Sequence, residues 1–166
     1  MHAWLVWIET SSFSVWVRES PSLLAFPAIL SLHTIGMGLV AGVSAAIDLR
    51  ILGIAPGVPL LEMKRLFPVI WFAFWLNAAS GVVLLIGYPT KAVTNPVFYL
   101  KLLFIALAIT GFKLIAKHVF QDPSLDHNPV RGKGRRLAVA SLACWAGAIA
   151  AGRLLAYTYS KLTSVD

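Results

Sequence analysis

The chain has 166 residues, of which 58% are hydrophobic and only 13% are charged, and its formal net charge is +7. A soluble domain is usually about a quarter charged, and a fold of this size cannot hide so much apolar surface from water. The composition therefore predicts an integral membrane protein. It argues against a nucleic-acid-binding face, because the basic residues stand in short loops between apolar stretches.

The first segment, residues 3–18, is rich in tryptophan and interrupted by charge. Trp4, Trp7 and Trp16 alternate with polar positions, and Glu9 lies in the middle. The segment is too short and too polar to cross a bilayer, whereas tryptophan is favoured at headgroup depth. We expect an interfacial helix that lies on the membrane.

Four apolar stretches follow, each long enough to span a bilayer as a helix. Short loops between successive spans favour antiparallel neighbours and an up-down-up-down order. The sequence thus predicts one all-α domain, residues 1–166, built as a four-helix transmembrane bundle. The predicted spans are residues 23–47, 68–88, 96–118 and 137–157.

Basic residues predict the orientation, because lysine and arginine accumulate on the cytoplasmic side of a membrane. One face of the predicted bundle carries eight of them and the other carries four. We therefore expect the first face to be cytoplasmic and both termini to lie on the opposite side. The first set is Arg50, Lys64, Arg65, Lys117, Arg131, Lys133, Arg135 and Arg136, and the second is Arg18, Lys91, Lys101 and Lys161.

His33 is the principal candidate for a functional residue. It lies within the first span, where an imidazole must find a hydrogen-bond partner, water or a metal. Membrane bundles hold haem between helices through histidine, so haem iron is one predicted ligand of His33. The alternative is a structural histidine that is hydrogen-bonded inside the bundle.

Lys101 and Arg153 are expected about 4–8 Å from His33, displaced toward the non-cytoplasmic face, given a rise of about 1.5 Å per residue. Cations at that position would pair with haem propionates, and a neutral Lys101 could serve as a second axial ligand. The alternative for both is snorkelling, with the charged head reaching water or phosphate. Asp48, at the end of the same span as His33, is expected to be an interfacial anchor in an ion pair.

Met37 stands one turn after His33, so the two side chains share a helix face. Both residue types bind copper, and together they form an alternative metal site for Cu(I). Packing in the bundle is the other interpretation of Met37. The single cysteine, Cys144, excludes an intramolecular disulfide.

Several short motifs resemble the start of an uncharacterised bacterial family of small four-helix membrane proteins. They are Arg18-Glu19-Ser20, Leu32-His33, Gly36, Asp48-Leu49-Arg50 and Leu52-Gly53. More distantly, His33 and the Lys101 that opens KLLF are similar to positions in HemJ-type protoporphyrinogen oxidases and copper-resistance D membrane domains. That resemblance implies haem b at His33. Where HemJ-type proteins have a further histidine, this chain has Lys113.

Together these features predict a haem b-binding protein of the bacterial inner membrane with periplasmic termini. Its expected role is electron transfer, or anchoring of a periplasmic redox partner, within an oxidoreductase complex. One alternative is a cofactor-free accessory subunit that binds another membrane protein or a second copy of itself. HemJ-like porphyrinogen oxidation and copper handling are further alternatives.

Overall fold

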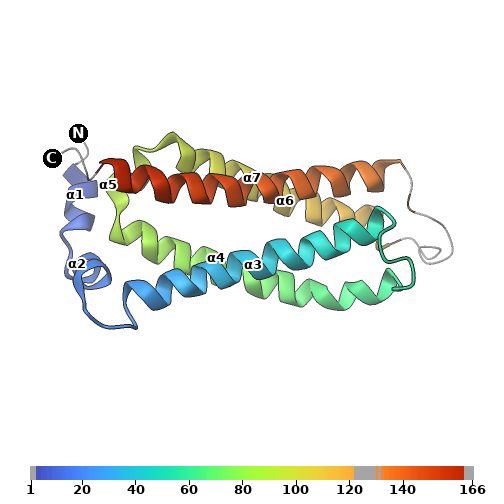
Figure 1. Cartoon of the computed structure of the whole chain (residues 1–166), viewed down its shortest axis with the longest axis horizontal. Helices are drawn as coiled ribbons and strands as arrows, with labels where there is room; N and C mark the ends of the chain where they lie inside the picture. The colour runs from blue at the N-terminus through green and yellow to red at the C-terminus, as the bar shows by residue number, and fades with distance from the viewer. Residues whose placement is uncertain (1–2, 122–129, 131, 163–166) are drawn as a thin grey trace.

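Four long helices form the molecule, as expected for an all-α membrane bundle. The computed structural model describes residues 3–121, 130 and 132–162, with the backbone alone for residues 158–162. Figure 1 shows the long helices lying side by side along one axis. They are α3 (Phe26–Ile51), α4 (Phe67–Gly87), α6 (Pro96–His118) and α7 (Lys133–Leu162).

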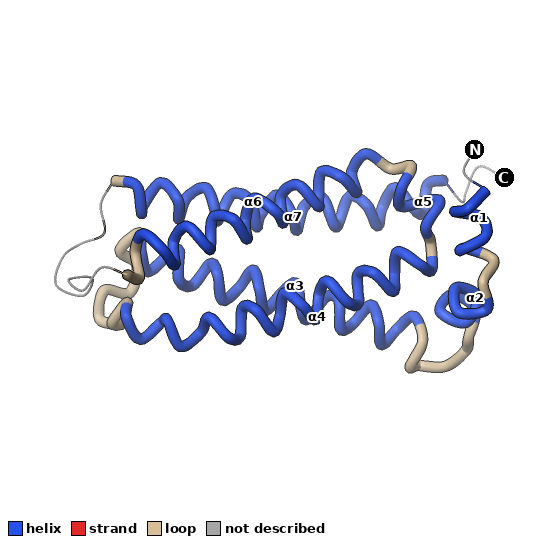
Figure 2. Tube along the Cα trace, turned by 180° about the vertical axis from the view of Figure 1, so that it is seen from behind, coloured by secondary structure: helices blue, strands red, loops and turns tan. Residues whose placement is uncertain are grey.

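The long helices pack as two antiparallel pairs. α3 packs against α4, α6 packs against α7, and α3 also contacts α7. Figure 2 shows the two pairs one above the other, with the connections alternating between the two ends. The predicted up-down-up-down order is therefore confirmed. The core between the pairs is apolar and includes Ile47, Ile70, Phe112, Ile115 and Trp145.

The outer surface of the bundle is apolar as well. In each long helix the most apolar window has a mean hydropathy of 1.6 to 2.1, yet only 17–28% of that window is buried inside the molecule. Exposed side chains such as Phe72, Trp75, Leu103 and Ile149 cover this surface. Such a surface requires lipid around it, because in water it would aggregate.

α3 and α7 differ at both ends from the predicted spans, residues 23–47 and 137–157, because apolar length and helix length are different quantities. α3 begins at Phe26, with Pro27 in its first turn, and continues to Ile51. Asp48 therefore lies inside the helix, although the apolar stretch was expected to end before it. α7 likewise begins at Lys133, since the charged residues before the apolar stretch are good helix formers.

The N-terminal segment forms two short helices in place of the single predicted one. α1 (Ala3–Glu9) and α2 (Ser12–Glu19) are separated at Ser11, whose side chain accepts a hydrogen bond from the Ser14 backbone and caps α2. Both helices lie across one end of the bundle, with α1 beside α5 (Pro89–Val93) (Figure 1). The 3₁₀ helix η1 (Leu61–Leu66) leads into α4 at the opposite end.

α2 is attached to α4 by two hydrogen bonds to one carbonyl group. The Ser14 hydroxyl and the Arg18 guanidinium both donate to the backbone oxygen of Gly87, each at 3.3 Å. Arg18 also pairs with Glu9 at 3.4 Å. Gly87 closes the last turn of α4, so these bonds satisfy a carbonyl that the helix itself leaves open.

Candidate functional site

Four polar side chains from three helices meet inside the bundle, and we call them the His33 cluster. His33 comes from α3, Asn77 and Ser80 come from α4, and Lys101 comes from α6. Asn77 and Ser80 are buried, while His33 and Lys101 are half-buried. The cluster thus links the two helix pairs through polar contacts inside the bundle.

The contacts of His33 determine which ring nitrogen carries the proton. Nδ1 lies 3.0 Å from the backbone oxygen of Asn77, which can only accept a hydrogen bond. Nδ1 therefore carries the proton and donates it, and Nε2 presents a lone pair. The Ser80 hydroxyl, 3.2 Å from Nδ1, accepts a share of the same bond while donating to the Leu76 carbonyl at 2.7 Å.

Lys101 occupies the other ring nitrogen. Its Nζ lies 3.1 Å from Nε2 of His33, so the amine donates to the imidazole lone pair. Both nitrogens of the ring are therefore bonded to protein groups. The side chain of Lys101 points into the bundle, not outward to a headgroup as snorkelling would require.

Two glycines allow α3 and α4 to approach closely at the cluster. A Cβ atom at Gly81 would lie 3.0 Å from Cε1 of His33, and one at Gly36 would lie 2.9 Å from the backbone nitrogen of Asn77. The Asn77 amide also donates to the backbone oxygen of His33 at 2.7 Å. Each helix therefore places a polar residue against a glycine of the other, a common device of membrane helix pairs.

The charge of Lys101 has no carboxylate beside it. Within the described residues, the ion pairs involve Arg18 and Arg65, and Lys101 is in none. Its stem runs along α7 at Gly152, where a Cβ atom would lie 3.7 Å from Cε. An amine at this depth depends on the His33 lone pair for its partner, which makes the pair strongly interdependent.

The other predicted site residues lie apart from this contact. Arg153 is exposed on α7, next to the Gly152 that contacts Lys101. Met37 is half-buried and packs against the apolar core. Among the described residues, no group of three or more histidine, cysteine, aspartate or glutamate side chains gathers around a common point.

The fit of a haem to this site can be judged from the ring contacts. A metal-bound histidine commonly donates its second N–H to a carbonyl group, and the bond from Nδ1 to Asn77 has that form. Nε2 would then be the atom to hold iron, and that nitrogen is bonded to the Lys101 amine. The residue types fit a haem, but the amine would have to withdraw from Nε2 to admit iron.

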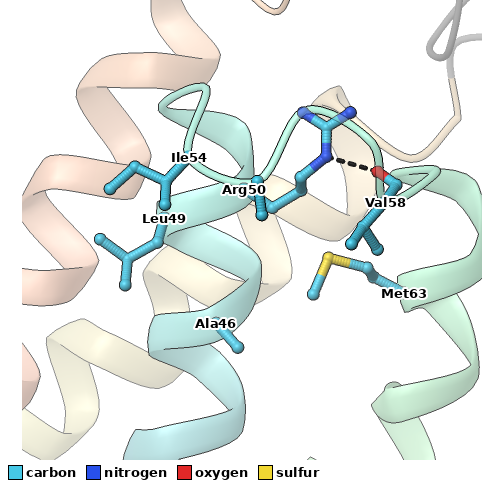
Figure 3. A pocket seen from close by; sticks show the side chains of 7 residues that line it. Ala46, Leu49, Arg50, Ile54, Val58 and Met63 are labelled. Atoms are coloured by element: carbon cyan, nitrogen blue, oxygen red, sulfur yellow. Dashed lines mark hydrogen bonds between the residues drawn. The ribbon is translucent and has the colours of Figure 1, made fainter.

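A cavity of about 260 Å³ lies at the other end of α3 and is lined by apolar side chains and Arg50 (Figure 3). Arg50 donates from Nε to the Val58 carbonyl and from Nη2 to the Pro56 carbonyl. These bonds hold the α3–α4 connector against the helix end. The seventeen-residue separation from His33 along α3 corresponds to about 25 Å, so the cavity is no part of the His33 cluster.

His118, at the end of α6, is exposed and bonded locally. Its Nδ1 donates to the Leu114 carbonyl at 2.9 Å, and its Nε2 accepts from Lys133 at 3.1 Å. It is a polar helix end. His2 and His127 lie outside the described residues.

Sequence reasoning identified His33 and Lys101 but not the roles of Asn77 and Ser80. The two are the strongly polar residues of an apolar span, and an intramembrane amide needs a partner as much as an imidazole does. The need of both side chains for a hydrogen-bond partner is the sequence feature from which the contact between Asn77 and His33 could have been predicted.

The chain matches no family model, no curated protein and no solved structure. A functional assignment must therefore come from the geometry of its own residues.

Proposed function

We propose that the chain is an accessory subunit of a membrane complex in which His33 is a structural residue and binds no haem. The observation that carries this proposal is the occupation of both His33 ring nitrogens, by Asn77 on one side and Lys101 on the other. A ring that is already bonded twice has no lone pair to offer to iron unless a protein bond is broken.

An open face of α3 supports the partner-binding part of the proposal. Among the described residues, a Cβ atom at Gly38 or Gly42 would meet nothing within 4 Å, so neither glycine serves packing within that part of the chain. Ala46, one turn further, is also exposed. Glycine costs a helix about 1 kcal/mol relative to alanine, and small residues four apart let a second membrane helix approach closely. The partner that fits this face is another transmembrane helix.

The optical spectrum of the purified protein tests the absence of haem at His33. We expect no Soret band, and we expect His33→Ala to lower stability because it leaves the Lys101 amine without its partner. His118→Ala is the matched control, since it removes an exposed histidine. A Soret band that disappears in His33→Ala and persists in His118→Ala would contradict the proposal.

The second candidate is a haem b-binding electron carrier or anchor of a periplasmic redox protein. The bond from Nδ1 to the Asn77 carbonyl favours it, since it fixes the tautomer that an axial histidine needs. Haem would supply one-electron chemistry. In this candidate Lys101 would leave Nε2, and Lys101 and Arg153 would supply the positive charges that hold the carboxylates of the haem. Haem reconstitution of wild-type protein, absent in His33→Ala, would establish it.

We further propose that the end of the bundle with α1 and α2 is periplasmic in a bacterial inner membrane, because the opposite end carries more basic residues. Cysteine accessibility in intact spheroplasts tests this orientation. With Cys144→Ser as background, Thr10→Cys should react with an impermeant maleimide, whereas Glu62→Cys should react only after lysis. The reverse pattern would invert the topology.

A further inference from the structure

A second group of polar side chains lies at the contact between α3 and α7, and we call it the Asp48 cluster. It consists of Ser44 and Asp48 on one helix and Ser141 and Trp145 on the other, and each is only 2% exposed. Residues four apart share a helix face, and α3 packs against α7 (Figure 1). The Ser141 hydroxyl faces the Asp48 carboxyl group across this contact.

Every member of the Asp48 cluster has a buried polar atom without a protein hydrogen bond. These atoms are Oγ of Ser44 and Ser141, Oδ2 of Asp48 and Nε1 of Trp145. Buried polar atoms are almost always bonded, and one lone exception would carry little meaning. Four exceptions on the facing surfaces of two helices indicate that something outside the protein completes the group.

The two serines also depart from the behaviour of the other hydroxyls in the long helices. Ser31, Thr34, Ser80 and Thr110 each donate to the carbonyl four residues before them, at 2.7 to 2.9 Å. Ser44 and Ser141 have such a carbonyl within reach and do not use it. The Ser44 hydroxyl is therefore free for a ligand at the helix contact, and the Ser141 hydroxyl is directed at the Asp48 carboxyl group instead of its own helix.

The charge of Asp48 limits what that ligand is. Within the described residues no basic group pairs with Asp48, and Arg50 turns away to the Pro56 and Val58 carbonyls. The expected ion pair at this helix end is therefore not formed. An isolated carboxylate at this depth is costly, so a positive ligand is favoured.

We propose that the Asp48 cluster binds a small monovalent cation, with sodium as the fitting ion. Hard cations take oxygen ligands, and one ion would engage Asp48 Oδ2 and both serine hydroxyls together. A single carboxylate balances one positive charge, whereas a divalent ion would leave net charge buried. The indole N–H of Trp145 is a donor, so it bonds to one of the ligating oxygens and not to the ion.

Thermal unfolding of the full chain in nanodiscs, with sodium chloride exchanged for choline chloride at constant ionic strength, tests the site. At ten times the dissociation constant, sodium should raise Tm by about 3–6 °C, and above the dissociation constant the rise should be linear in the logarithm of the sodium concentration. Asp48→Asn should abolish the rise. The sodium-dependent part of the tryptophan fluorescence should disappear in Trp145→Phe, because that indole lies in the site.

Ser141→Ala keeps the carboxylate and removes one ligand, so it carries the test even if Asp48→Asn does not fold. It should weaken the apparent sodium affinity about tenfold or more. Ser31→Ala, on the same helix as Asp48 but bonded to its own backbone, is the matched control and should not change the affinity. A wild-type Tm that does not respond to sodium would overturn the proposal. The cluster would then consist of a protonated Asp48 carboxyl group with bound water. Equal effects of the two serine variants would overturn it too.

Discussion

The His33 cluster and the Asp48 cluster are both polar groups in an apolar bundle, but only the first is complete. In the His33 cluster each ring nitrogen has a protein partner, and the Asn77 amide returns a bond to α3. In the Asp48 cluster four buried atoms have none. The first cluster therefore fixes how the helices pack, whereas the second is where we propose that a cation binds. The presence of a polar residue in the membrane does not by itself distinguish a structural role from a functional one. The hydrogen-bond partners of that residue make the distinction.

The largest effect should come from filling the close contact at the His33 cluster. In Gly36→Ala the new methyl group would lie 2.9 Å from the Asn77 backbone nitrogen, so α3 and α4 must separate. We expect a loss of about 2–3 kcal/mol in the free energy of unfolding, as for an overpacked core. Unfolding in mixed micelles measures it.

Gly38→Ala is the matched control, because the same substitution on the same helix meets no atom within 4 Å. It should raise helix stability by up to about 1 kcal/mol. Equal losses in both variants would show that the close contact at Gly36 does not determine the packing.

The next effect concerns the coupling between His33 and Lys101. His33→Leu should cost about 1–2 kcal/mol, because it leaves the Lys101 amine unpaired and removes one of the donors to the Asn77 carbonyl. Adding Lys101→Met should restore part of that loss, since the unpaired amine is then gone. A double-mutant cycle should give a coupling of about 1 kcal/mol. Additive effects would mean that the 3.1 Å contact contributes nothing.

Asp48→Asn should have a smaller effect of opposite sign in sodium-free buffer. Removing an uncompensated buried charge should stabilise the bundle by about 1 kcal/mol. With saturating sodium the wild type should equal or exceed the variant, since the ion then supplies the missing charge. Chemical unfolding in the two buffers measures both values. A variant that is less stable than the wild type in both buffers would indicate that Asp48 has a protein partner.

The smallest effects should separate bonded from unbonded hydroxyls. Ser80→Ala removes a hydroxyl bonded to Leu76 and His33, and it should cost about 0.5–1 kcal/mol. Ser44→Ala removes one with no bond, so in sodium-free buffer it should be neutral or stabilising by about 0.5 kcal/mol. The test is whether Ser80→Ala lowers the free energy of unfolding more than Ser44→Ala does. Equal losses would show that the bonded and unbonded hydroxyls do not differ in this way.

The fold was predictable from sequence because the mean hydropathy of a long stretch of residues determines whether it can span a membrane. Four apolar stretches and short connections determine a bundle without reference to any one contact. The helix break at Ser11 was not predicted, because a local cap overrides the continuous tryptophan-rich pattern.

The candidate site was predictable only in part. His33 and Lys101 stood out because ionisable residues at membrane depth are rare. Their direct contact was not predicted, because it depends on how α3 and α6 are rotated about their axes. Both helices are apolar on every face, so the sequence pattern does not determine that rotation. Asp48 was placed outside the apolar span, because the sequence alone did not show that the helix continues past it to Ile51.

The bonds from Ser14 and Arg18 to Gly87 have a consequence for biosynthesis. The two contacts join residues 73 and 69 positions apart, so the ribosome completes α2 well before its acceptor exists. During translation α1 and α2 are therefore present before α4, their binding partner. Their tryptophans favour the lipid headgroup region during that time. Docking of α2 then becomes a late event that follows insertion of the first helix pair. If α4 does not insert correctly, the N-terminal segment should therefore remain accessible to protease.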